Sequence, residues 1–335
     1  MNWNLLLSAF TAAAMLSKWR QQKELMPYVI VVLGLVQVFF LLVSGFVESP
    51  FVRNEIIPAD GNGLNPLLRH PGMIIHPPML YLGFVGLTIP YAFAMAALMS
   101  NQKGDNWIKT SRRWTLVAWL FLSLGLILGG RWAYDVLGWG GYWGWDPVEN
   151  ASLMPWLAAT AFLHSVMIQE KMRMFKMWNM LLIVLTFCLV ILGTFIVRSG
   201  VISSVHSFAQ SAIGPFFFGF IVVMFIFSAY WITVRRESLR TENQIVSYLS
   251  REAAFLYNNF LIIAILAVPG SIIHTQLGHI DWSIALAMIL GVMPGSYLGS
   301  FFTLRARNRR VLLLFSCFLF AIGIIFLFRE IRGLV

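Results

Sequence analysis

Long apolar stretches recur along the whole chain, and they constrain its fold more than any other feature. The apolar stretches that we predict to be membrane spans cover residues 3–17, 26–47, 79–99, 114–130, 150–168, 178–197, 215–234, 254–273, 282–302 and 311–328. Only 11% of the 335 residues are charged, whereas a soluble domain carries about 25%. A transmembrane helix needs roughly 20 mostly apolar residues, so the sequence predicts an all-α, polytopic membrane protein with about ten transmembrane helices.

Lysine and arginine are distributed unevenly between the loops that connect these stretches. The chain has 24 of them, and most fall in loops 18–25, 100–113, 169–177, 235–253 and 303–310. Cytoplasmic loops of membrane proteins carry such an excess of basic residues. We therefore expect these loops to be cytoplasmic and both termini to face outward. The bias also explains the formal net charge of +10, which then gives no indication of a nucleic acid as partner.

The two cysteines, Cys188 and Cys317, stand alone inside apolar stretches. They form no CxxC pair and no disulfide framework, which are the patterns that accompany thiol chemistry or covalent heme attachment. We therefore expect no thiol chemistry on this chain.

The outer loop after residue 130 carries an unusual aromatic segment, RWAYDVLGWGGYWGWDPVENASLMPW, at residues 131–156. Glycines alternate there with large rings, so the backbone can bend closely while flat side chains project from it. These rings offer a stacking surface with polar edges, which suits a large planar ligand such as a porphyrin. The candidate platform residues are Trp139, Tyr142, Trp143 and Trp145. The alternative interpretation is an aromatic belt at the membrane interface.

The same segment contains a pattern typical of a helix start. Asp146, Pro147 and Glu149 stand where an N-cap residue, a first-turn proline and the acid of a capping box are found. Asp146 is therefore expected to cap the next helix. Capping is compatible with a second role in binding a ligand.

Histidines on the outer side are candidate axial ligands for a heme iron. Two residues separate His76 from the span that begins at residue 79, and these are Pro77 and Pro78, which restrict the backbone. His206 falls in the outer loop that follows residue 197. The two histidines could bind heme from opposite sides beside the aromatic platform, and an ordinary loop hydrogen bond is the alternative for each. His70 lacks a comparable setting and is expected to be structural.

His164 falls within a predicted span, where an ionisable side chain is costly and commonly functional. At about 1.5 Å per residue it is expected roughly 25 Å along the helix that begins near Pro147. It could ligate a second heme inside the bundle. A hydrogen-bonded contact between helices is equally open from the residues alone.

Four stretches carry a resemblance to a known family. They are LNPLLRHPGMIIHPPMLYLGFVG, WGGYWGWDPVENASLMPWLAATAFLHS, LGTFIVRSGVISSVHSFAQSAIGPFF and SREAAFLYNN, and with their spacing they cover about residues 40–260. In these stretches the chain resembles the CcmF/NrfE family of bacterial cytochrome c maturation, which belongs to the WWD-motif heme-handling proteins. The resemblance implies a heme lyase of the bacterial inner membrane, which joins heme vinyl groups to the CxxCH cysteines of an apocytochrome.

The resemblance also implies roles for single residues. His76 and His206 match the axial ligands of the heme being delivered, and His164 matches one of two ligands of a resident heme b. The WWD segment that holds the delivered heme on the periplasmic face is represented by Trp139, Trp143, Trp145 and Asp146. The implied partners are a membrane-anchored heme chaperone, the apocytochrome c and other maturation subunits.

The chain departs from the pattern of this family in two places. The chain begins near the family's second or third span, and after Leu261 the continuation that carries the second heme b histidine does not appear. Residues 262–335 instead resemble the end of a TauE/SafE-type anion exporter. We therefore expect two domains, 1–261 and 262–335, and a second polypeptide that supplies the missing half. The alternative functions are heme export by a WWD-family protein and, judged from the tail alone, export of a small anion.

Overall fold

The computed structural model describes residues 1–53, 60–61, 63–102, 104, 106–138, 141–199, 213–240, 243 and 257. All of these residues lie in the unit Met1–Gly270, the first of two into which the chain divides. The regular structure of this part is entirely helical, as the sequence predicts. In chain order the elements are α1 (Asn2–Lys18), α2 (Met26–Leu42), η1 (Val43–Val47), η2 (Pro66–Arg69), α3 (Gly72–Gly86), α4 (Thr88–Met99), α5 (Asn106–Val136), α6 (Pro147–Met172), α7 (Lys176–Ser199), α8 (Gly214–Val234) and η3 (Arg236–Leu239).

Six helical segments among the described residues are long and apolar enough to cross a membrane. They are α2 with η1, α3 with α4, α5, α6, α7 and α8, and each of them contains one predicted span. The predicted span 3–17 forms α1, which has 17 residues. Apart from Tyr257, the last three predicted spans lie outside the described residues. The chain is therefore a multi-pass membrane protein, with six candidate spans in the part that is described.

Helix α3 begins at Gly72, well before residue 79, where the sequence suggested that a span starts. His76 therefore lies inside a helix, and its placement in the preceding loop was wrong. Pro77 and Pro78 lie inside the helix, where the φ angle of proline is close to the helical value but each proline lacks the backbone N–H of a helix hydrogen bond.

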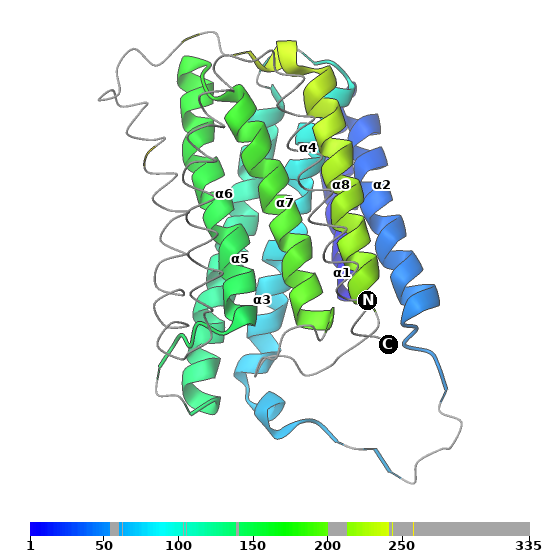
Figure 1. Ribbon diagram of the computed structural model, residues 1–335, viewed down its shortest axis with the longest axis vertical. Coiled ribbons are helices and arrows are strands. Elements are labelled where there is room, and N and C mark those ends of the chain that lie inside the picture. The colour runs from blue at the N-terminus through cyan, green and yellow to red at the C-terminus, as the bar shows by residue number, and fades with distance from the viewer. Residues whose placement is uncertain are drawn as a thin grey trace, which may run out of the picture. The chain divides into compact units, whose positions relative to one another are not determined.

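Helix α4 is buried at the centre of the described helices. Every residue from Thr88 to Leu98 is buried, and α4 contacts α2, α5, α7 and α8. The ring of Tyr91 stacks on Phe187 of α7 with centroids 4.0 Å apart, and its hydroxyl oxygen lies 2.8 Å from Oγ of Ser228 in α8. A helix that is apolar on all sides is expected at such a position. Figure 1 shows α6, α7 and α8 running side by side, and these helices contact one another in that order.

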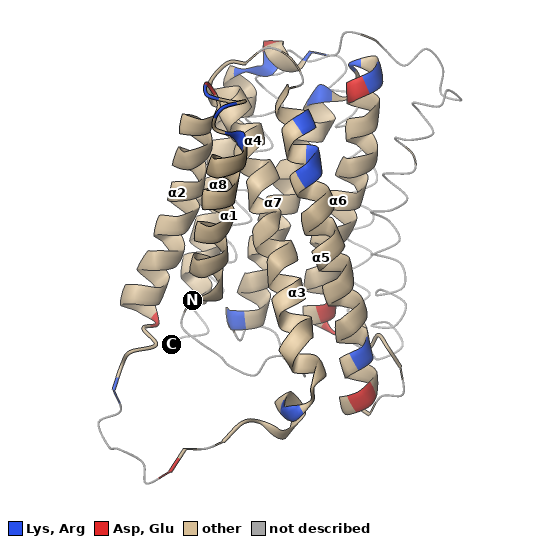
Figure 2. Ribbon diagram, turned by 180° about the vertical axis from the view of Figure 1, so that it is seen from behind, with Lys and Arg blue, Asp and Glu red and all other residues tan. Residues whose placement is uncertain are grey.

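Charged side chains of the described residues gather toward the two ends of the helices, and the middle of these helices carries none (Figure 2). Successive long helices alternate in direction, so that the end of α6 and the start of α7 lie at one end of the helices. The end of α5 and the start of α6 lie at the other. This separation matches the low cost of charges at the membrane surfaces and their high cost in the hydrocarbon.

Helices α3 and α5 approach each other unusually closely. A Cβ atom added at Gly83 would lie 2.6 Å from the backbone nitrogen of Leu122. One added at Gly125 would lie 2.8 Å from Cα of Leu80. Small residues permit such backbone contact, which drives helix association in membranes. We call this contact the α3–α5 seam; its facing residues are Gly72, His76, Leu80, Gly83 and Gly86 on α3 and Ala118, Leu122, Gly125, Gly129 and Trp132 on α5.

The seam predicts which glycines tolerate a side chain. Gly83→Ala is expected to lower the free energy of unfolding by about 1–3 kcal/mol, because its methyl group would press on backbone. Gly34→Ala in α2 is the matched control, since a Cβ there would meet no described atom within 4 Å. Thermal unfolding of the purified protein in detergent measures both. Equal stability of the two variants would contradict the close approach of α3 and α5.

Candidate functional site

The aromatic segment identified in the sequence connects the end of α5 at Val136 to the start of α6 at Pro147. Its backbone packs on α5, because a Cβ atom added at Gly130 would lie 2.8 Å from the carbonyl oxygen of Tyr142. The Tyr142 ring stacks on Tyr134 of α5 with centroids 4.6 Å apart and an interplanar angle of 13°. The segment is thus docked on the last turns of α5.

The predicted capping box at the start of α6 is confirmed. The backbone N–H of Val148 donates to Oδ2 of Asp146 at 3.0 Å, and that of Asp146 donates to Oε2 of Glu149 at 3.2 Å. The same Glu149 oxygen accepts a hydrogen bond from the backbone N–H of Gly144 at 2.9 Å. The Glu149 carboxylate therefore holds the backbone on both sides of Trp145. Trp145 has a φ angle of +56°, which is uncommon for a residue other than glycine.

Two tryptophans of the segment contact each other edge to face. The rings of Trp143 and Trp145 have centroids 6.1 Å apart and an interplanar angle of 84°. The Trp143 Nε1–H group is buried and has no acceptor within the described part of the chain. A buried donor of this kind is costly when unpaired, so it fits a ligand that carries an acceptor. Trp139 lies outside the described residues.

The His76 ring is held by the backbone of α5. Its Nδ1 lies 2.7 Å from the carbonyl oxygen of Gly125. A carbonyl oxygen only accepts hydrogen bonds, so Nδ1 carries the hydrogen and donates it. In the neutral imidazole the lone pair that can bind a metal is then on Nε2.

His76 and the aromatic segment meet on adjacent residues of α5. A Cβ atom added at Gly129 would lie 2.5 Å from Cε1 of His76, and Gly130 contacts the carbonyl of Tyr142 as described above. The structure therefore brings this predicted ligand close to residues 141–146. The second predicted ligand, His206, lies outside the described residues.

His70 fastens the start of α3 to the end of α5. The backbone N–H of Gly72 donates to its Nδ1 at 3.1 Å, and its Nε2 lies 3.7 Å from Oδ2 of Asp135. The same Asp135 oxygen accepts a hydrogen bond from Nε of Arg131 at 3.0 Å. This geometry agrees with the structural role expected of His70. Arg131 and Asp135 were not among the predicted residues, although their spacing of four residues is a known signal for a helix ion pair.

His164 lies on α6 beside a set of polar contacts between α5 and α6. Its Nδ1 lies 2.8 Å from the carbonyl oxygen of Thr160, so Nδ1 is again the donor. Oγ1 of Thr160 accepts a hydrogen bond from Nε1 of Trp119 at 2.8 Å. Nε1 of Trp156 donates to Oγ of Ser123 at 2.7 Å, and the two indole rings stack with centroids 5.7 Å apart. These contacts lie along α6 between the aromatic segment and His164.

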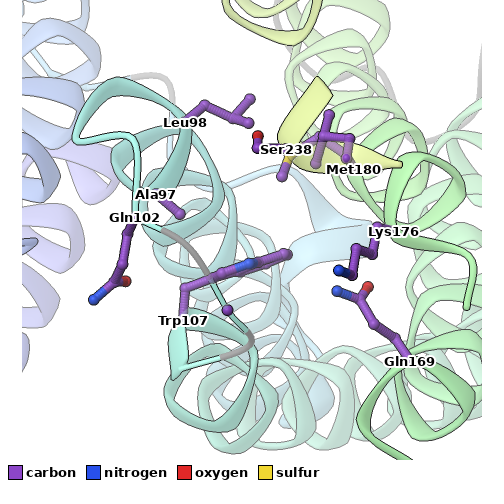
Figure 3. Close-up of a pocket in the computed structure, with 10 residues that line it drawn as sticks. Ala97, Leu98, Gln102, Trp107, Gln169, Lys176, Met180 and Ser238 are labelled. Carbon is purple, nitrogen blue, oxygen red and sulfur yellow. The ribbon is translucent and has the colours of Figure 1, made fainter. Parts of the chain in front are cut away.

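A small cavity lies at the opposite end of the helices, where α4 and α6 end and α5 and α7 begin. It is lined in part by Gln102, Trp107, Gln169 and Lys176 (Figure 3). Its volume of about 30 Å³ holds about one water molecule. None of the predicted heme residues lines it, so the outer end remains the candidate site.

Residues 1–203 match the family model of the cytochrome C assembly protein. The chain belongs to this family. Its relatives include the cytochrome c-type biogenesis protein CcmF of Escherichia coli K12, which is 44% identical over 283 residues, covering 82% of this chain and 44% of CcmF. The cytochrome c-type biogenesis protein CycK of Bradyrhizobium diazoefficiens is 48% identical over 229 residues, covering 68% of this chain and 34% of CycK.

A solved structure, that of the cytochrome c heme lyase CcmF, matches with a TM-score of 0.62 and 36% identity. The match covers 82% of this chain and 40% of that one. The chain therefore spans less than half the length of these cytochrome c assembly relatives. Residues 257–326 match a second family model, the sulfite exporter TauE/SafE. The resemblance to the CcmF/NrfE family is thus confirmed, and the resemblance of the C-terminal residues to TauE/SafE exporters corresponds to a match over residues 257–326 alone.

The glycines of α5 are the site residues of this family member that the sequence analysis missed. Gly125 binds the His76 ring, Gly129 lies against it, and Gly130 supports the aromatic segment. Two small residues four apart in an apolar helix are a known signal for close helix packing. The run GLILGG at residues 125–130 carries that signal. This signal predicts a close contact at the glycines of α5, but it does not predict which residue of another helix lies against them.

The capping role of Asp146 can be separated from any further role. Asp146→Ala is expected to lower the free energy of unfolding by about 1 kcal/mol, whereas asparagine caps helices as well as aspartate. Asp146→Asn is therefore the matched control and should unfold near the wild-type temperature. An Asp146→Ala variant as stable as the wild type would contradict the capping role. If Asp146→Asn keeps the wild-type stability but loses heme binding, the negative charge of Asp146 has a role in binding.

Proposed function

We propose that this chain is a heme lyase of cytochrome c biogenesis, or a subunit of one. It holds heme on its outer face between His76 and His206 and presents it to the CxxCH thiols of an apocytochrome c. Family membership supports this proposal, as do relatives named cytochrome c-type biogenesis proteins and a structural neighbour named a cytochrome c heme lyase.

The single observation that carries the proposal is the hydrogen bond from Nδ1 of His76 to the carbonyl oxygen of Gly125. Metal-ligating histidines almost always donate their other ring N–H to a carbonyl or carboxylate, which sets the tautomer and orients the ring. His76 has this arrangement at the outer end of α3. A carbonyl partner therefore prepares Nε2 as the ligating nitrogen.

The neighbouring aromatic residues fit a flat, largely apolar ligand. Trp143 and Trp145 supply ring surface, and the buried Nε1–H of Trp143 suits a polar substituent of that ligand. Trp139 is proposed to add to the same platform. Asp146 contributes by holding the backbone through its capping box. The reacting vinyl groups belong to heme and the thiols to the apocytochrome, so this chain's residues bind and orient the heme.

His164 is proposed as one ligand of a resident heme b. Its Nδ1 also donates to a carbonyl, that of Thr160, which leaves Nε2 as the ligating nitrogen of the neutral ring. The second ligand is proposed to come from another maturation subunit. The further proposed partners are a membrane-anchored heme chaperone, the apocytochrome c and other maturation subunits.

We propose two domains and one orientation for the chain. Residues 1–261 form the heme-handling domain, and residues 262–335 form a membrane tail, in keeping with the match of residues 257–326 to TauE/SafE exporters. The aromatic segment faces the periplasm from the bacterial inner membrane. The excess of lysine and arginine in the loops at the opposite end of the helices supports this orientation.

The function is tested by optical spectra of the purified full chain supplied with hemin and reduced with dithionite. The wild type is expected to bind heme with low-spin bands, and His76→Ala and His206→Ala are each expected to lose them. His70→Ala is the matched control and should keep the bands, since His70 contacts protein groups and not the proposed ligand. Wild-type spectra in both His76→Ala and His206→Ala would contradict the proposal. A band lost only in His164→Ala would report the resident heme.

The orientation is tested by labelling single cysteines introduced into a variant in which Cys188 and Cys317 are serine. A cysteine at Asn65, in the loop before α3, should react with a membrane-impermeant maleimide added to intact spheroplasts. A cysteine at Gln21, between α1 and α2, should react only after lysis. The reverse pattern would overturn the proposed periplasmic placement of the aromatic segment.

A further inference from the structure

The His76 ring occupies a gap in the α3–α5 seam that only glycine leaves open. A Cβ atom at Gly129 would lie 2.5 Å from Cε1, 2.9 Å from Nδ1 and 3.1 Å from Nε2 of the ring. The whole imidazole therefore lies across the Cα of Gly129. One helical turn away, the carbonyl of Gly125 accepts the Nδ1–H hydrogen bond. Residues four apart share one helix face, so the two glycines act on the same ring.

The seam cannot open easily to make room for a side chain at residue 129. On the inner side of His76, Gly125 already lies against the backbone of Leu80. On the outer side, Nε1 of Trp132 donates to the carbonyl of Leu67 at 3.2 Å, which ties α5 to the segment before α3. With the backbones restrained on both sides, the imidazole is the group that has to move.

We propose that Gly129, together with the carbonyl of Gly125, is a positioning residue that presents Nε2 of His76 to heme. Gly129 provides the space for the ring, and the Gly125 carbonyl selects the tautomer. This inference rests on the proposed function of the same site. It predicts that a methyl group at residue 129 displaces the ring from its hydrogen bond and weakens heme ligation.

The same geometry predicts that α5 itself survives the change. In an α-helix the carbonyl of residue 125 also accepts the backbone N–H of residue 129, so Gly125 keeps a partner when the ring moves away. Alanine is also a better helix former than glycine. The effect of Gly129→Ala is therefore confined to His76 and to what His76 binds.

The test is a double-mutant cycle in the full chain with Gly129→Ala, His76→Ala and the combined variant. Hemin titrated into the purified, dithionite-reduced protein is expected to bind about tenfold more weakly to Gly129→Ala, in the range found for residues that orient metal ligands. Gly219→Ala in α8 is the matched control, because a Cβ there would meet no described atom within 4 Å. It should bind hemin as the wild type does.

The cycle also has a readout that does not depend on heme. Without hemin, Gly129→Ala is expected to unfold at a lower temperature than the wild type, and this loss should vanish in the His76→Ala background, where no ring is left to clash. If Gly129→Ala alone fails to fold, recovery of folding in the combined variant supports the same contact. A loss that persists without the His76 ring would overturn the inference.

The outcomes separate this inference from the proposed function. If His76→Ala binds hemin like the wild type, the proposed ligand role of His76 fails, and the positioning role fails with it. If His76→Ala loses hemin while Gly129→Ala keeps wild-type affinity and a wild-type spectrum, the heme site stands and the positioning role of Gly129 is overturned. Additive losses of affinity in the combined variant would overturn it as well.

Discussion

The close contact of two helix backbones at the α3–α5 seam is the constraint on which the outer site depends. Because Gly83 and Gly125 carry no side chain, α3 comes near enough to α5 for an imidazole on one helix to bond a backbone carbonyl of the other. The next residues of α5 continue this role, since Gly130 admits the backbone of the aromatic segment. One face of α5, packed against α3, thus positions both His76 and the aromatic segment.

Two pairs of polar side chains inside these helices satisfy each other where a membrane interior offers no water. The Tyr91 hydroxyl meets Ser228, and the Trp119 indole meets Thr160. Each contact joins two different helices and sets how they are placed along each other. His164 lies one helical turn from the second of these contacts, and its ring is oriented by the carbonyl of Thr160 in its own helix.

Local features of the chain were predictable because they depend on neighbouring residues. Apolar length predicts the helices, and the spacing of Asp146, Pro147 and Glu149 predicts the capping box that the structure contains. The predicted start of this helix at residue 79 was wrong, because the two prolines after His76 were taken to end a loop. Proline is also accommodated inside a helix when a backbone hydrogen bond is given up, and the sequence pattern alone does not choose between the two.

The order of the residues is enough to show that this chain is helical, that it spans a membrane several times and that it belongs to the cytochrome c assembly family. It also placed an aromatic segment and two histidines on one predicted side. The atoms that surround His76 depend on the packing of the helices, because its partner Gly125 is 49 residues away in the sequence. A contact at that separation depends on which helix packs against the small residues of α5, and the spacing of those residues does not identify the partner helix.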